Sequence, residues 1–307
     1  MQTIREYFKF DKTKGDVGVE IEMEGATRFP VERSELPRIW AAEYDGSLRG
    51  HSVEYVTRGP VGVNTVSKHL NSLAASLKDF GARVNKSFRA GVHIHVNVQE
   101  MNFTEVGNMA AIYYCLEKPL VKFCGSSREG NHFCLRTEDA EYPIEVLKEA
   151  LKRGRPQMLS TDRLRYASLN LSSLAKYGSL EFRAMETQPD LSKINSWAKM
   201  LVNIRAAAVS MESRTDIAYQ MSNLGPENWA KTVLGEEFYQ RIAYNGIEED
   251  ILSSMRNVQT LIHLKDKPSG GKKEDITTKV EGIRLDEVFS TGAGRIGATP
   301  TNIRFFN

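Results

Sequence analysis

The stretch Ala90-Gly91-Val92-His93-Ile94-His95-Val96-Asn97 decides how the rest of the chain is interpreted. Its aliphatic residues alternate with histidine and asparagine, which predicts a β-strand because successive side chains of a strand point to opposite faces of a sheet. The aliphatic set then faces a core, while His93, His95 and Asn97 share the other face. The two histidines lie about 7 Å apart along the strand and can reach one metal ion or one anionic ligand. Alone, such a pair is more often an ordinary polar face, so the other strands decide its meaning.

A second predicted strand, residues 16–24, carries three glutamates on one face. Glu20, Glu22 and Glu24 alternate with aliphatic residues and methionine. Three carboxylates in a row repel each other, so the arrangement costs stability unless cations compensate. The alternative is an exposed edge strand charged against pairing, but that role needs fewer charges and usually uses lysine. We therefore favour a metal-binding face.

Three further β-rich runs show the same asymmetry between an apolar and a polar face. They are residues 53–57 with Glu54, residues 165–171 with Arg165 and Asn170, and residues 178–184 with Glu181 and Arg183. The last two runs, joined by residues 172–177, predict a hairpin or meander. Helical spacing predicts helices over residues 61–80, 102–123, 143–152, 191–212, 226–242 and 247–263. The pattern predicts an α+β fold in which helices cover the apolar face of one mostly antiparallel sheet, whose open face collects the polar side chains.

The composition sets limits on the class of protein. The chain has 307 residues, is 41% hydrophobic and 26% charged, and carries a net charge of +2, so nothing favours general nucleic-acid binding. Apolar runs long enough to span a membrane are absent, and the first residues do not resemble a secretory signal. Cys115, Cys124 and Cys134 fit free thiols in a reducing compartment, so we expect a cytoplasmic protein without a membrane partner.

Two segments of different composition divide the chain. Residues 1–264 are expected to form one α+β domain, and residues 265–307 to form a glycine- and lysine-rich linker and a C-terminal tail. The tail contains a G-x-G-x-x-G sequence at residues 292–297, which we reject as a dinucleotide site because no strand precedes it and the chain ends ten residues later. Residues 303–306 are a candidate docking segment for a partner.

The polar face combines carboxylates, histidines and arginines. Carboxylates and a neutral imidazole suit Mg²⁺ or Mn²⁺, whereas arginines repel those cations and require an anion such as phosphate. Metals and arginines together indicate a nucleoside triphosphate held for phosphoryl transfer, since that chemistry consists mostly of positioning and charge neutralisation.

Several motifs in order resemble the putative amidoligase family, which belongs with glutamine synthetase and glutamate–cysteine ligase. They are Glu-x-Glu at residues 20–22, Asp-Gly-Ser at 45–47 followed by Glu54, Gly-x-His-x-His-x-Asn at 91–97, and Arg165, Asn170 and Ser-Leu-Glu-Phe-Arg at 179–183. The resemblance covers roughly residues 16–210 and implies that residues 1–264 are a catalytic domain. It also implies a curved sheet that forms half a funnel, with ATP entering at one end and Mg²⁺ or Mn²⁺ bridging its phosphates.

The resemblance implies a role for each motif residue. Glu20, His93 and Glu181 resemble ligands of a phosphate-side metal, and Glu22 and Glu54 resemble ligands of a metal that faces the acyl group. His95 resembles a histidine that contacts the substrate or the transferred phosphate, and Arg165 and Arg183 resemble phosphate-stabilising arginines. Asn97 and Asn170 are placed with them on the nucleotide, and Asp45, like Glu54, is a candidate to take a proton from the incoming amine.

The implied activity is an ATP-dependent ligation of a carboxylate to an amine through an acyl phosphate. The substrates would be small molecules or peptides, and the helices after residue 190 could supply the interface of a homo-oligomer. Three alternatives stay open: a phosphotransferase like the guanidino kinases, a metal-dependent hydrolase that uses His93 and His95, and a non-catalytic binding or assembly protein on the same fold.

Overall fold

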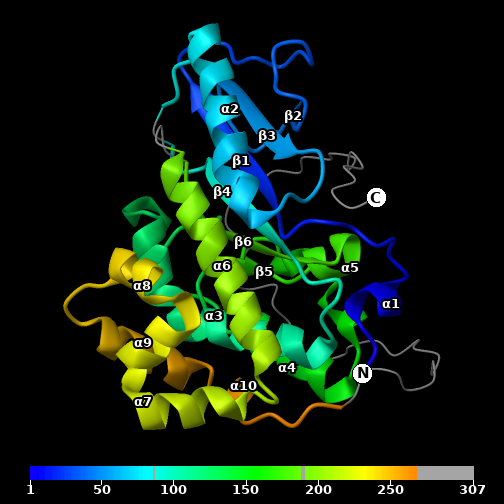
Figure 1. Ribbon diagram of the computed structural model, residues 1–307, viewed down its shortest axis with the longest axis vertical. Coiled ribbons are helices and arrows are strands. Elements are labelled where there is room, and N and C mark those ends of the chain that lie inside the picture. Colours follow the sequence, from blue (N-terminus) through cyan, green and yellow to red (C-terminus); the bar gives the residue numbers. More distant parts are fainter. Residues whose placement is uncertain (86, 188–190, 268–307) are drawn as a thin grey trace, which may run out of the picture.

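The computed structural model describes residues 1–85, 87–187 and 191–267 (Figure 1). Within these residues, six strands form one antiparallel sheet in the order β2-β3-β1-β4-β6-β5. The strands are β1 (Val17–Gly25), β2 (Trp40–Glu43), β3 (His51–Thr57), β4 (Gly91–Asn97), β5 (Leu169–Asn170) and β6 (Ser179–Glu186). The predicted linker, the glycine-rich segment and the docking segment of the tail lie outside the described residues, apart from residues 265–267.

The register of the sheet places the predicted polar residues side by side. Glu20 of β1 lies opposite His93 of β4, and Glu22 lies opposite Glu54 of β3. On the other side of β4, His95 lies opposite Glu181 of β6. Residues directly opposite in an antiparallel pair share a face and touch, so four strands contribute to one polar surface.

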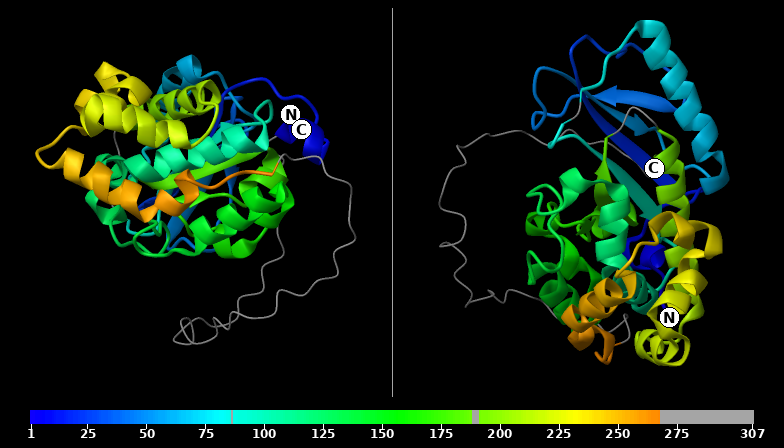
Figure 2. Two further views of the ribbon diagram at one scale, coloured as in Figure 1. Left: turned by 90° about the horizontal axis from the view of Figure 1, so that it is seen from below. Right: turned by 90° about the vertical axis from the view of Figure 1, so that its left-hand side faces the viewer.

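The described helices are α1 (Ile4–Phe8), α2 (Val66–Phe80), α3 (Phe103–Cys124), α4 (Tyr142–Arg153), α5 (Ser173–Tyr177), α6 (Ser192–Ser210), α7 (Thr215–Leu234), α8 (Glu236–Ile242), α9 (Ile247–Asn257) and α10 (Gln259–Ile262). Helices α2, α3 and α6 cover the opposite, apolar face of the sheet, whereas Tyr177 of α5 contacts His95 on the polar face. Figure 1 shows α2 and α6 lying across the sheet. Helices α8 and α9 pack against α3, at the same end of the molecule as α7 and α10 (Figure 2).

Aliphatic side chains of the central strands form the core beneath these helices. Alternate residues of β1 and β4 are completely enclosed, among them Ile21 and Ile94. From the helices, Tyr113 of α3 and Trp197 of α6 pack edge-to-face against Phe182 of β6. This one-sided burial leaves the other face of the same strands to polar side chains, and it confirms the predicted α+β fold.

The predicted hairpin is confirmed, because β5 and β6 are antiparallel neighbours, whereas the bounds of one strand and of one helix are wrong. The strand expected over residues 165–171 is confined to Leu169–Asn170. Before it, the carbonyl of Tyr166 and the N–H of Ser168 bond to the backbone of Leu135, and only the carbonyl of Ser168 bonds to β6, at the N–H of Arg183. The connection to β6 contains the short helix α5, which ends at Gly178 with a φ of +65°. The helix expected over residues 226–242 does begin after a break, because Gly225 within α7 is non-helical with a φ of +77°, but it is divided into the end of α7 and α8 at Gly235, where φ is +85°. The helical residues from Thr215 to the break at Gly225 were not predicted. The sequence also gave no indication of β2.

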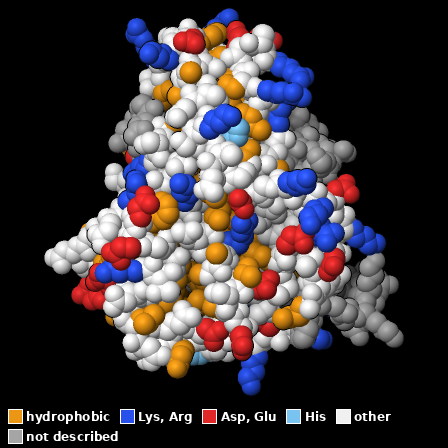
Figure 3. Space-filling model, viewed as in Figure 1, with side chains coloured by type: hydrophobic (Ala, Val, Ile, Leu, Met, Phe, Trp, Pro, Cys, Tyr) orange, Lys and Arg blue, Asp and Glu red, His pale blue; other side chains and the backbone are white. Residues whose placement is uncertain are grey.

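The cysteines, the helices and the surface each bear on the expected class of protein. Cys115, Cys124 and Cys134 are buried free thiols. Among the described helices, none has the length and apolarity to cross a membrane. Figure 3 shows the helix-covered face, where acidic and basic side chains are scattered between apolar ones.

Candidate active site

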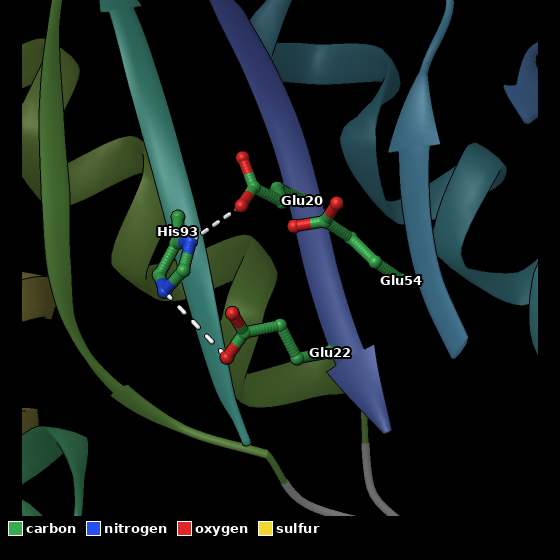
Figure 4. Close-up of side chains that lie close together, drawn as sticks. All are labelled: Glu20, Glu22, Glu54 and His93. Atoms are coloured by element: carbon green, nitrogen blue, oxygen red, sulfur yellow. Dashed lines mark hydrogen bonds and ion pairs between the residues drawn. The ribbon is translucent and has the colours of Figure 1, made fainter. Parts of the chain in front are cut away.

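Three glutamates and a histidine converge on the polar face of the sheet. Glu20 and Glu22 come from β1, Glu54 from β3 and His93 from β4 (Figure 4). One ligand atom from each lies within 4.8 Å of the other three. The alternation of the strands explains this, because each residue stands between core residues and therefore points away from the core. We call these four residues the acidic cluster.

Hydrogen bonds fix most of the cluster. Glu20 contacts both strand histidines, with 2.7 Å from Oε1 to Nδ1 of His93 and 3.3 Å from Oε2 to Nε2 of His95. Glu22 accepts the backbone N–H of Gly91 at 2.7 Å, and its Oε2 lies 3.8 Å from Nε2 of His93. Among the described residues, that Nε2 has no hydrogen-bond partner, although the side chain of His93 is only 1% exposed.

Glu181 and Arg183 of β6 extend the cluster across β4. Glu181 Oε1 lies 3.7 Å from Nδ1 of His93 and forms an ion pair with Arg183. Asn170 donates its amide to the other oxygen of Glu181 at 2.7 Å. A β-bulge in β6 lies opposite His93, and Nη1 of Arg183 is 3.4 Å from Nδ1 of that histidine. Carboxylates, imidazoles and one guanidinium thus form a continuous polar surface.

Burial and mutual repulsion shift the proton affinities of the carboxyls. Burial, with the neighbouring charges of Glu20 and Glu22, raises the pKa of Glu54 to about 12. Burial also acts on Glu20, but the charge of His93 and hydrogen bonds from Glu54 and both histidines outweigh it and hold the pKa of Glu20 well below its usual range. Burial raises the pKa of Glu22. These opposite shifts favour the proton on Glu54, whose carboxyl hydrogen-bonds to that of Glu20.

The donor set fits a divalent cation. Several carboxyl oxygens and one unpartnered imidazole nitrogen face each other in a buried space. Hard oxygen ligands with one imidazole suit Mg²⁺ or Mn²⁺. A bound cation would also remove the repulsion that otherwise keeps a proton on Glu54.

Other predicted residues lie around the cluster. His95 Nδ1 is 3.2 Å from the hydroxyl of Ser179, and the ring of Tyr177 meets the imidazole edge-on. Asn97, at the far end of β4, donates its amide to the backbone of Gly15 at 3.0 Å and so holds the segment that leads into β1. Asp45 follows β2, hydrogen-bonds to Ser47, and contributes to the raised pKa of Glu54.

The structure does not bring Arg165 or Glu24 into the cluster. Arg165 is exposed, follows the 3₁₀ helix η4 (Asp162–Leu164), and lies over the ring of Tyr166. Glu24, at the end of β1, accepts the backbone N–H of Arg49 at 2.7 Å.

Two features of the polar face were missed by the sequence. Val56 lies opposite Glu20 and packs with Ala41 and Tyr177, apart from the main core. The only indication in the sequence is that Val56 stands two residues after Glu54 and so shares its face of the strand. The second feature is the buried Arg128 of the 3₁₀ helix η2 (Ser126–Arg128), whose guanidinium lies against Gly91. Nothing in the polar loop around it distinguished that arginine from an exposed one.

Comparison with known proteins gives one match. A family described as "Putative amidoligase enzyme" matches residues 51–204, about half of the chain. The matched range includes Glu54, both strand histidines, Glu181 and Arg183, while β1 and β2 lie outside it, before residue 51. A search of curated proteins finds no match.

Proposed function

The chain belongs to the amidoligase family, and from this premise we propose that it is an ATP-dependent carboxylate–amine ligase, which forms an amide or isopeptide bond through an acyl phosphate. The observation that carries the proposal is the convergence of the acidic cluster with Glu181 and Arg183 on one buried polar face. A metal-dependent hydrolase would have no need of the buried guanidinium, whereas phosphoryl transfer uses both kinds of charge.

Five residues would hold Mg²⁺ or Mn²⁺: Glu20, Glu22, Glu54, His93 and Glu181. When bound, the metal supplies positive charge that offsets the charge of the ATP phosphates during transfer. Arg183 adds a fixed cation, because its ion pair with Glu181 anchors one edge of the guanidinium while its buried Nε has no partner. That N–H is available to an oxygen of the transferring phosphate.

The reaction has two steps. An oxygen of the substrate carboxylate attacks the γ-phosphorus of ATP, and the bond to the β-phosphate oxygen breaks to release ADP. The amine nitrogen then attacks the acyl carbon, phosphate leaves, and a carboxylate takes the amine proton. Asp45 and Glu54 are the candidates for that base, and we assign the phosphate contact to His95, which lies between Ser179 and Glu20.

The apolar patch of Val56, Ala41 and Tyr177 adds a wall without charge beside the cluster. We assign it to the carbon skeleton of a substrate, since a ring or an aliphatic chain gains by covering such a surface.

The test is phosphate release from ATP and Mg²⁺ across a panel of acids and amines, with the products identified by mass spectrometry. Release that requires both partners, and a product lighter than their sum by one water, supports the ligase. Glu181→Ala should abolish turnover, while Glu149→Ala on the exposed side of α4 should not change it. A phosphorylated product without an amide, or turnover without ATP, would refute the ligase.

A further inference from the structure

Arg128 is an enclosed cation on the same face as the acidic cluster. Its side chain is 0% exposed. A Cβ built on Gly91 would lie 2.5 Å from its Nη2 and 3.2 Å from its Cζ. Since Gly91 alternates with His93 and His95 along β4, that direction is the polar face. The guanidinium therefore occupies the space that a side chain at position 91 would fill, next to His93 on the polar face.

The guanidinium of Arg128 forms no ion pair within the described residues, although Glu186 lies opposite Gly91 in the sheet and bonds to the hydroxyl of Ser127. Nη2 donates to the backbone carbonyl of Arg183 at 2.8 Å, but Nε and Nη1 have no hydrogen-bond partner. An unpaired buried charge is costly, and arginine cannot escape the cost by losing its proton. If Arg128 only braced β6, one neutral donor would be enough for that single carbonyl.

The surroundings of Arg128 also belong to the candidate site. The residue it covers, Gly91, donates its backbone N–H to Glu22 of the acidic cluster. The carbonyl it binds belongs to Arg183, whose guanidinium contacts Glu181 and His93. Glycine within a strand often marks a close approach by another group, and here it makes room for the guanidinium.

We propose that Arg128 and Arg183 together form an oxyanion subsite beside the acidic cluster. The ligand is either a phosphate group of the nucleotide or the carboxylate of the acid substrate, since a guanidinium fork binds both in the same way. The assignment rests on the proposed function for the choice of these ligands, but the anion site itself does not depend on ligation. In this proposal, Arg128 and not the exposed Arg165 is the second arginine of the site.

The test compares Arg128→Met with the unchanged protein by thermal unfolding and by isothermal titration. The probes are orthophosphate and glutarate, each with Mg²⁺. Because methionine removes an unpaired buried charge, the variant should unfold without anions at the same or a higher temperature than the unchanged protein. Its affinity for the bound anion should fall about tenfold to a hundredfold, as expected when a charge-assisted pair is lost.

Arg136→Met is the matched control. Arg136 lies in the same loop region, but its guanidinium pairs with Glu138 and Asp139. The control should leave the response to both anions unchanged. Loss of the orthophosphate response in Arg128→Met assigns the subsite to a phosphate, and loss of the glutarate response assigns it to the substrate carboxylate.

A lower unfolding temperature with both anion responses intact would overturn the proposal and leave Arg128 as a structural brace. If Arg128→Met does not fold, Gly91→Ala tests the same point, because the added Cβ displaces the guanidinium; unchanged anion affinity there would also overturn it. Binding is measured without turnover. A protein that binds orthophosphate through Arg128 but ligates nothing would therefore refute the proposed function and keep the subsite.

Discussion

Replacing Glu22 by glutamine should stabilise the metal-free protein and weaken its metal binding. The side chain is buried, and burial raises the pKa of its carboxyl. Glutamine keeps an oxygen that can accept the N–H of Gly91, as Glu22 does at 2.7 Å. The substitution therefore removes a charge and a metal ligand while it retains the local hydrogen bond.

The magnitude follows from the spacing of the cluster. Two unit charges at the 4.8 Å limit of the cluster repel each other by about 3.5 kcal/mol at an effective dielectric constant of about 20. The lost attraction of Glu22 to His93 and Arg183 offsets part of this. A net gain of about 1–2 kcal/mol, or roughly 2–8 °C in the midpoint of unfolding, is expected without metal. The affinity for Mn²⁺ should fall about tenfold or more.

The assay is thermal unfolding in EDTA and across a titration with Mn²⁺. Glu24→Gln is the control, because Glu24 lies on the same face of β1 but outside the acidic cluster and binds the backbone of Arg49. The control should leave the Mn²⁺ response unchanged. If Glu22→Gln destabilised the protein in EDTA and kept the full Mn²⁺ response, the reasoning about repulsion and ligation at this cluster would be refuted.

Two further predictions concern pH. The raised pKa values of Glu54 and Glu22 mean that the metal-free protein holds at least one extra proton, which a metal must displace. The affinity for Mn²⁺ should therefore rise with pH, by up to about tenfold per pH unit for each proton released. Calorimetric titration in two buffers of different ionisation enthalpy counts the released protons. An affinity that does not change with pH would contradict the assignment of these carboxyls as metal ligands. Glu117 of α3 is buried and hydrogen-bonds to Thr137 and Ser168, yet burial raises its pKa above the unfolded value. The protonated carboxyl then contributes stability at low pH, and this stability is lost as the pH rises from the unfolded pKa through the folded one. Between pH 5 and 8, Glu117→Gln should therefore lose less free energy of unfolding, measured in urea, than the unchanged protein. Equal slopes of the free energy of unfolding against pH in the two proteins would disprove this.

The sequence predicted the polar face well because strand alternation carries that information. Glu20, Glu22, Glu54, His93 and Glu181 each stand between core residues, so their side chains had to share a face once the strands paired. The register decides which of them touch, and it depends on the buried aliphatic set, which a one-residue slip would expose. The strands with strict alternation were therefore the ones predicted correctly.

The errors fall where long-range contacts override the local pattern. Residues 165–168 have the composition of a strand, but their backbone pairs with Leu135, which is distant in sequence, and this leaves Arg165 exposed. Strand β2 is four residues long, and its alternation is too short to detect. Arg128 shows the limit most clearly, because its position depends on the chain folding back over Gly91.

The site contains an excess of negative charge in one place and an unpaired positive charge in another, and a single ligand could account for both. The acidic cluster holds more negative charge than His93 and Arg183 neutralise, which is why a proton stays on Glu54. Beside Gly91 on the same face, the guanidinium of Arg128 forms no ion pair with a described residue, and its Nε and Nη1 have no hydrogen-bond partner among them. Its Nη2 is bonded to the backbone carbonyl of Arg183, so the positive and negative groups stay apart in the structure. A metal-bound phosphate carries a cation and oxyanions in one ligand and would satisfy both imbalances at once. Buried charges without partners lower the stability of the free protein. Here one ligand would pair both kinds of charge, which is what we expect of a site whose charges are arranged for binding.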